Sequence, residues 1–443
     1  MERASYRARV SAGLSRIASV ARGQRIIGQI DAVEGDKVSG WAMDVFQPER
    51  PVTVTLVAGD RELAHVVADQ FRSDLQSAGF GTGRHGFDAT VPLRGLSRET
   101  IPVSARVAGR ARPLDFHGRE TFTIGPDEFL GLMAGDLVNN CNLRCPFCIV
   151  DYSRISNTQL MKREAFEKLL TLLPHVPDGA FWLSCLHEPT LHPKLGEFMQ
   201  MIPPAYARKV AFTTNLVRPV PDELFTIWAQ SGIHHINVSF DTLNEELFSF
   251  LRRPGRLPVF LANLRRMTDI FRKHPGAPRL RFITMAFRSN LEDIPEIVRL
   301  TNEEHLSSEN EIRYTYNVGH ITDDFRRTQY LSADEWQLLS ARLAAQPYRY
   351  TLALPPPGAE ELDIGSANYL DIPISPTFTG PKIEPPLSLR ARMDGVVMIV
   401  DHESAWAMDI RDIADPPAFF YDFAREVCAQ AAEPLATAGN PPG

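Results

Sequence analysis

The feature that most constrains the fold is an alternation of strand-like and helix-like patterns between about residues 130 and 345. Six short apolar runs are each followed by a stretch with apolar residues at helical spacing. Repeats of this kind give parallel strands joined by helical crossovers. Because six repeats fall short of the eight in a closed barrel, we expect an α/β fold with an open, partial (β/α)6 barrel over residues 126–346, or a doubly wound sheet as the alternative. The strand-like runs are Leu132–Asn139, Ala180–Leu186, Val210–Thr214, Ile236–Phe240, Leu280–Ala286 and Ile312–Val318.

The residues before this region have a different pattern. From residue 26 to about 125, short alternating runs are separated by turn residues such as Glu34-Gly35-Asp36. Short strands at this spacing predict an all-β sandwich domain. We therefore expect an N-terminal β-sandwich at 26–125, followed by the partial barrel.

Three further segments complete the chain. Residues 1–25 carry six arginines and one acidic residue, and we expect a surface helix there, with an organelle transit peptide as the alternative. The proline-rich residues 347–390 predict an extended connector without regular structure. Residues 391–443 predict a small C-terminal cap, and the Asp-Gly pair at 394–395 marks the turn of a hairpin that begins near residue 387.

Composition excludes several classes of protein. The 47 basic and 54 acidic residues give a net charge of −7, so there is no global basic footprint for nucleic acid. No apolar run reaches the roughly 18 residues that span a bilayer, so we expect no transmembrane segment. The five cysteines are too few for a disulfide framework, and their odd number favours a reducing, cytoplasmic location.

Three of the five cysteines lie within eight residues. Cys141, Cys145 and Cys148 have the spacing C-x3-C-x2-C and follow the first predicted strand, at the end of the strands where α/β barrels carry their chemistry. Three thiolates cannot saturate a four-iron cluster, which takes four ligands, so one iron would stay open. The alternative from the residues alone is a structural zinc site with His187 as the fourth ligand.

The C-x3-C-x2-C motif, with Phe147 before its last cysteine and six strand–helix repeats around it, resembles the radical S-adenosylmethionine (SAM) enzymes. The resemblance covers about residues 130–345. It implies that Cys141, Cys145 and Cys148 ligate one 4Fe–4S cluster, and that the open iron binds SAM. It also implies that Phe147 shields the adenine or the cluster.

Other strand ends resemble the same family in order along the chain. His187-Glu188-Pro189 is similar to its Gly-Glu-Pro motif, with histidine in place of glycine, and Thr214-Asn215-Leu216 is similar to its Thr-Asn-Gly motif, with leucine in place of glycine. The fourth strand end is similar to its Ser-x-Asp motif. The resemblance implies cofactor contacts for Phe147, His187, Glu188, Pro189, Asn215, Ser239, Asp241, Arg288 and Asn290.

The resemblance also implies a reaction. Reductive cleavage of SAM would give a 5′-deoxyadenosyl radical that removes a hydrogen atom from a small-molecule or peptide substrate, with an electron donor of flavodoxin or ferredoxin type. Cys185 is a candidate hydrogen-atom donor to the substrate radical, and a small buried core residue is the alternative. Only Cys185 and Cys428 remain outside the motif, too few for a second four-cysteine cluster, so we expect one cluster per chain.

Residues 26–93 resemble a small β-sandwich domain that accompanies bacterial glycosyltransferases, through segments such as Ser39–Asp44 and Arg84-His85-Gly86-Phe87. This likeness favours a sugar or nucleotide sugar as substrate. Two alternatives stay open. One is a zinc-stabilised adaptor, without catalytic activity, that binds glycan or protein through the sandwich. The other is an enzyme-like fold that has lost catalysis, because His187 and Leu216 replace glycines of the family motifs.

Overall fold

A computed structural model describes residues 25–92, 97–184, 186–304, 306, 309–315, 318–353, 373–378, 380–399 and 406–428. Contacts divide the chain into two compact units, Met1–Glu128 and Phe129–Gly443. Within the described ranges, no helix combines the length and apolar character needed to cross a bilayer.

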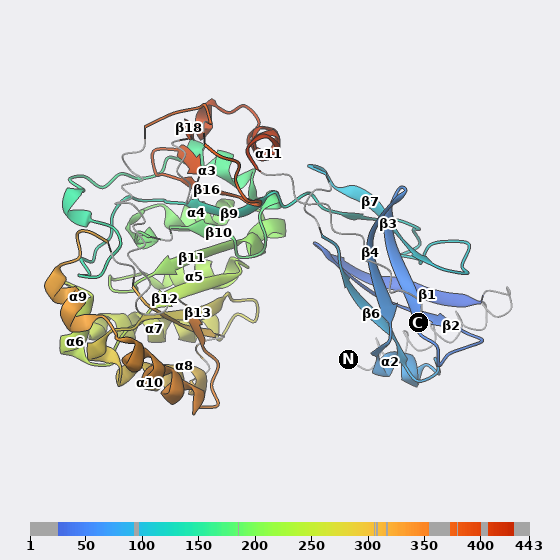
Figure 1. Ribbon diagram of the computed structural model, residues 1–443, viewed down its shortest axis with the longest axis horizontal. Helices are drawn as coiled ribbons and strands as arrows, with labels where there is room; N and C mark the ends of the chain where they lie inside the picture. Colours follow the sequence, from blue (N-terminus) through green and yellow to red (C-terminus); the bar gives the residue numbers. More distant parts are fainter. Residues whose placement is uncertain are drawn as a thin grey trace. The chain divides into compact units, whose positions relative to one another are not determined.

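The N-terminal unit contains two four-stranded antiparallel sheets (Figure 1). The inner faces of both sheets contribute to one hydrophobic core, which includes Val38, Leu56, Phe87 and Ala105. Trp41, a candidate sugar-stacking residue by type, is buried and packs against Phe80, with ring centroids 4.9 Å apart. The first sheet has the order β1 (Ile26–Glu34), β2 (Lys37–Asp44), β6 (Arg84–Thr90), β5 (Gln70–Phe71), and the second has β4 (Arg61–Ala68), β3 (Val52–Ala58), β7 (Ile101–Val107), β8 (Phe122–Ile124); the short helix α2 spans Ser73–Ser77.

The C-terminal unit is built on a sheet in which seven parallel strands, β9 to β15, lie in chain order (Figure 1). This arrangement confirms the predicted strand–helix repeats and adds a seventh parallel strand, β15. Its three residues are too short to give a periodic signal, and they lie beside a proline-rich stretch. The strands are β9 (Leu130–Gly135), β10 (Phe181–Leu183), β11 (Val210–Thr214), β12 (His235–Ser239), β13 (Arg279–Met285), β14 (Glu309–Arg313) and β15 (Thr351–Ala353).

Helices cross between these strands and bury one apolar face each. The main core joins Phe166, Phe225 and Phe260 of the helices to Phe181 and Phe212 of the strands. A second core packs α8 against α10, which lie side by side in Figure 1. The helices are α3 (Arg163–Leu170), α4 (Leu195–Met201), α5 (Asp222–Gln230), α6 (Glu245–Leu251), α7 (Leu257–Phe271), α8 (Asp293–Glu303), α9 (Asp323–Gln329) and α10 (Ala333–Ala344).

The last part of the chain extends the same sheet. Strand β16 (Leu387–Ala391) pairs in parallel with β9, and β17 (Val396–Ile399) and β18 (Ala407–Asp409) follow in antiparallel pairing before helix α11 (Pro416–Val427). The prediction that 347–390 has no regular structure is therefore wrong at β15, whereas β16 and β17 confirm the hairpin predicted from residue 387. Strand β16 forms because alternate residues are buried and the edge strand β9 offers free backbone groups.

Candidate active site

The sequence-predicted residues converge on a cavity of about 430 Å³ at the carboxyl ends of the parallel strands. The cavity is lined by the cysteine loop after β9 and by residues on or just after β10 to β14. Eight of the residues singled out from the sequence line it: Cys141, Cys145, Phe147, Cys148, His187, Glu188, Asn215 and Ser239.

Hydrogen bonds attach the cysteine loop to three other segments. The side-chain amide of Asn139 donates to the carbonyl of Asn157 at 3.1 Å, and the main-chain N–H of Arg144 donates to the carbonyl of Arg253 at 2.5 Å. The main-chain N–H of Glu188 donates to the carbonyl of Asn140 at 3.2 Å. The loop is therefore fixed to the ends of other elements before any ligand binds.

The three loop cysteines are free thiols that are partly buried. Burial raises the pKa of all three, and it raises the pKa of Cys145 to about 12. The Arg252 guanidinium opposes this rise at Cys145 and Cys148. Cys141 Sγ also accepts from the main-chain N–H of Leu143 at 3.4 Å and from the Asn215 amide at 3.5 Å. A bound cation would therefore hold these sulfurs as thiolates, with nearby donors to share the charge.

The donor set fits an iron–sulfur cluster better than a single ion. Among the described residues, no group of three or more His, Cys, Asp or Glu side chains is arranged to hold one metal ion. A zinc site needs four side chains that converge on one point, whereas a cluster takes one thiolate on each of several irons. His187 is also engaged elsewhere, because its Nδ1 lies 3.0 Å from the Tyr152 hydroxyl. This geometry gives the zinc interpretation no support.

A buried ion pair lies beside the cysteines. Arg252 Nε donates to Asp241 Oδ2 at 2.5 Å, and the guanidinium lies 5.2 Å from the centre of the Phe147 ring. Asp241 Oδ1 accepts from the main-chain N–H of Met285 at 2.8 Å, so this carboxylate holds Arg252 and β13. The expectation that Asp241 contacts a cofactor stays a prediction: Arg252 lines the cavity, and Asp241 holds Arg252 without being part of that lining. Sequence reasoning missed Arg252 because it follows helix α6 and not a strand.

The Glu188 carboxylate accepts hydrogen bonds from four donors, two on Thr190 and two at the end of β11. Its Oε1 accepts from the Thr190 N–H at 3.2 Å, from the Thr190 hydroxyl at 2.7 Å and from the Thr214 hydroxyl at 2.9 Å. Its Oε2 accepts from the Asn215 N–H at 2.7 Å. Burial raises the pKa of Glu188, and these hydrogen bonds oppose the rise. Pro189 opens the short 3-10 helix η3 (Pro189–Leu191) and fixes this turn without lining the cavity.

The two replaced glycines behave differently. Leu216 has φ of +53°, the left-handed conformation that favours glycine. The glycine of the Thr-Asn-Gly motif therefore corresponds to a position where the backbone needs a positive φ. His187 is not among the residues with positive φ. Its ring lines the cavity, and burial lowers its pKa, so the neutral form is favoured.

Arg288 and Asn290 are not among the residues that line the cavity, and a cofactor contact for either one stays a prediction. Arg288 forms a two-point contact with Glu335 at the start of α10, at 2.6 and 3.0 Å. The Asn290 amide donates to the carbonyls of Asp241 and Met285, both at 2.8 Å. Asn290 thus joins the ends of β12 and β13, whereas Arg288 holds the start of α10. Cys185 lies outside the described residues.

The fold and site define an α/β protein with an open parallel barrel and a three-thiol loop after its first strand. Residues 137–301 match the model of the Radical SAM superfamily. The chain therefore contains a radical SAM domain. Proteins of this superfamily use a 4Fe–4S cluster and SAM.

Comparison with known proteins gives distant relatives. The chain is 22% identical over 201 residues to a probable GTP 3′,8-cyclase of Methanocaldococcus jannaschii. The aligned segment covers 43% of this chain and 64% of the relative. The chain is 29% identical over 171 residues to the GTP 3′,8-cyclase of Chlorobaculum tepidum, covering 38% and 48%. The chain thus matches less than two thirds of either relative's length. The crystal structure of Streptococcus suis SuiB bound to S-adenosylmethionine is similar with a TM-score of 0.45, at 13% identity over 66% of each chain.

Proposed function

We propose that the protein is a radical SAM enzyme that cleaves SAM reductively at one 4Fe–4S cluster and removes a hydrogen atom from an organic substrate. The observation that carries this proposal is the convergence of Cys141, Cys145 and Cys148 on one cavity with Glu188 and Asn215. The match of residues 137–301 to the superfamily supports it.

Each group around the cavity has a role in this proposal. The three cysteines would hold three irons and leave the fourth open to SAM. When bound, the cluster supplies the electron that breaks the sulfur–C5′ bond of SAM. Arg252 places a positive charge beside the thiolates, and the Asn215 amide donates toward the Cys141 sulfur. Phe147 packs against Phe287, with ring centroids 4.7 Å apart, and excludes water from one side.

The substrate is proposed as a small molecule or peptide, with a sugar or nucleotide sugar favoured by the likeness of residues 26–93 to a glycosyltransferase-associated domain. The curated relatives are named for a reaction on GTP, but they match only part of their length, so GTP is not part of the proposal. We further propose a cytoplasmic location and an electron donor of flavodoxin or ferredoxin type, because cluster thiolates are readily oxidised and require reducing conditions.

Anaerobic reconstitution tests the proposal. The wild-type chain should bind about four irons and, with dithionite and SAM, release 5′-deoxyadenosine. Cys145→Ala should lose both properties. Cys428→Ala is the matched control, because Cys428 follows α11 and packs against the main core away from the cavity. Absence of 5′-deoxyadenosine from the iron-loaded wild type, or equal production by Cys145→Ala, would refute the proposed activity.

A histidine variant separates this proposal from the zinc adaptor. His187→Ala should retain iron, because the His187 ring is hydrogen-bonded to Tyr152 and is not needed as a metal ligand. If instead the purified wild type holds zinc and His187→Ala releases it, the adaptor hypothesis is correct.

A further inference from the structure

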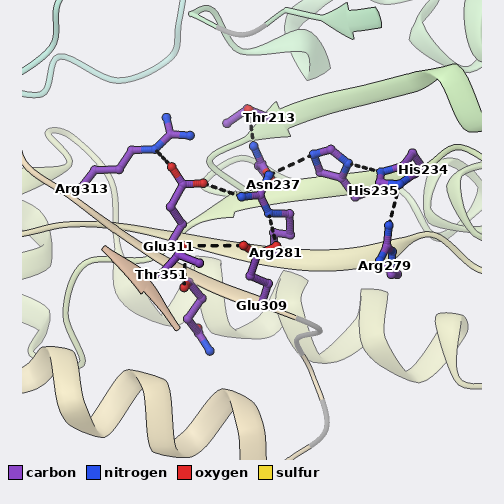
Figure 2. A network of polar contacts seen from close by, with 11 residues as sticks. Thr213, His234, His235, Asn237, Arg279, Arg281, Glu309, Glu311, Arg313 and Thr351 are labelled. Carbon is purple, nitrogen blue, oxygen red and sulfur yellow. Dashed lines mark hydrogen bonds and ion pairs between the residues drawn. The ribbon is translucent and has the colours of Figure 1, made fainter. Parts of the chain in front are cut away.

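The side of the cavity formed by β12 to β14 carries charged and polar side chains (Figure 2). Asn237 and Ser239 of β12, and Glu311 and Arg313 of β14, all line the cavity. Parallel strands of α/β folds are usually buried on both faces, and barrel interiors are filled by branched apolar residues. A polar layer on this face is therefore a departure that calls for a ligand or another compensating role.

Glu311 lies between two guanidinium groups. Its Oε1 accepts from Arg313 Nε at 2.6 Å and its Oε2 from Arg281 at 2.6 Å. Arg281 Nε is also 3.1 Å from a carboxylate oxygen of Glu309, and that carboxylate accepts from the Thr351 hydroxyl at 3.5 Å (Figure 2). The two arginines and the two glutamates of this network balance in charge, so a ligand at this wall would be recognised through donors and acceptors that the network leaves unused.

Two polar groups on this wall have capacity left for a ligand. Arg313 uses Nε for Glu311, its side chain is 40% exposed, and no hydrogen bond or ion pair joins its terminal nitrogens to another described residue. Asn237 is only 1% exposed; one end of its amide reaches the Thr213 hydroxyl at 3.5 Å, and its Oδ1 has no partner in the described part of the chain. A buried polar atom without a partner costs about 1–3 kcal/mol, so a bound group that supplies the missing hydrogen bond is favoured.

We propose that this wall is an oxyanion-binding subsite for the substrate. A carboxylate or phosphate oxygen would accept from the terminal nitrogens of Arg313, whose planar fork suits such groups. A hydroxyl or N–H of the same ligand would donate to Asn237 Oδ1. The inference rests on the proposed function, in which the carboxylate of SAM binds the open iron on the cysteine side, so this wall serves the second reactant.

Anion titration of the reconstituted, SAM-loaded protein tests the subsite. Inorganic phosphate and malonate are titrated separately by calorimetry without oxygen, which distinguishes phosphate-bearing from carboxylate-bearing ligands. At least one anion should bind the wild type, and Arg313→Gln should weaken that binding at least about tenfold, the loss of one charge-assisted contact. Arg279→Gln is the matched control: it makes the same charge change on β13, but Arg279 is exposed and lies outside the cavity lining.

A second variant keeps the test decisive if Arg313→Gln does not fold. Asn237→Asp is isosteric and places a carboxylate beside the bound anion, so it should weaken binding at least as strongly. The subsite is refuted if neither anion binds the wild type, if Arg279→Gln weakens binding as much as Arg313→Gln, or if Asn237→Asp binds as well as wild type. Because the titration needs no turnover, anion binding through Arg313 by a protein that makes no 5′-deoxyadenosine would refute the proposed function and leave the anion site standing.

Discussion

At the scale of single residues, the clearest departure from the family motifs is Leu216. Its left-handed conformation costs a non-glycine residue about 1–2 kcal/mol. Its side chain is completely buried in the main core, and full burial of a leucine contributes about 1.5–3 kcal/mol. The second effect offsets the first, so leucine is tolerated where the motif has glycine, and the replacement is not in itself a reason to expect lost catalysis.

This balance predicts an order of stabilities. Leu216→Gly should relieve the backbone strain of about 1–2 kcal/mol and lose side-chain packing that contributes about 2–5 kcal/mol. The net loss in the free energy of unfolding should be about 1–3 kcal/mol. Leu216→Ala should be less stable than Leu216→Gly, because it loses most of the packing and keeps the strained φ. Urea unfolding of both variants measures the order. A glycine variant more stable than wild type would show that burial at this position contributes little.

At the scale of elements, strand β16 joins the C-terminal extension to the strand that leads into the cysteine loop. Arg390 of β16 donates to Asp136 at 3.1 Å, and Asp136, just after β9, is completely buried. The main-chain N–H of Asp136 also donates to the carbonyl of Ala391 at 2.9 Å. The hairpin of the extension, which has no cysteines, therefore still contributes to the site, by holding the start of the loop that carries Cys141.

Arg390→Met should be strongly destabilising, because it leaves the Asp136 carboxylate buried without its cation. Loss of one partner of a buried pair costs about 3–5 kcal/mol. Arg411→Met is the control, since Arg411 pairs with the partly exposed Asp409 at the end of β18 and such surface pairs contribute about 0–1 kcal/mol. Denaturant midpoints compare the two variants, and equal small shifts would show that Arg390 does not hold the loop.

The start of α10 gives a pH-dependent prediction. Hydrogen bonds from Arg288 and Ser332 lower the pKa of Glu335 from 4.5 to about 2, so the folded state favours the charged form. The resulting stabilisation is present above pH 4.5 and is lost as the pH falls toward 2. Glu335→Gln should therefore melt at lower temperature than wild type at pH 7, and the difference should shrink between pH 5 and pH 2. A constant difference across that range would contradict the assigned role.

At the scale of the whole molecule, the sequence predicts those parts of the fold that depend on local patterns. The strand–helix alternation and the cysteine spacing are local, and both predictions place their residues around one cavity. Arg252 and the pairing of β16 with β9 depend on contacts between distant segments, which no local period reports. The hydrogen-bond partners of Arg288 and Asn290 could not be predicted for a related reason: a position near a strand end does not decide which neighbouring element the side chain contacts.

The central claim is that three thiolates hold a four-iron cluster and leave one iron free for SAM. Electron paramagnetic resonance of the dithionite-reduced, reconstituted protein tests it most directly, with spectra recorded before and after addition of SAM. The account predicts the signal of a reduced 4Fe–4S cluster that changes when SAM is added, because SAM becomes a ligand of the open iron. An iron-loaded protein whose signal is the same with and without SAM would contradict it.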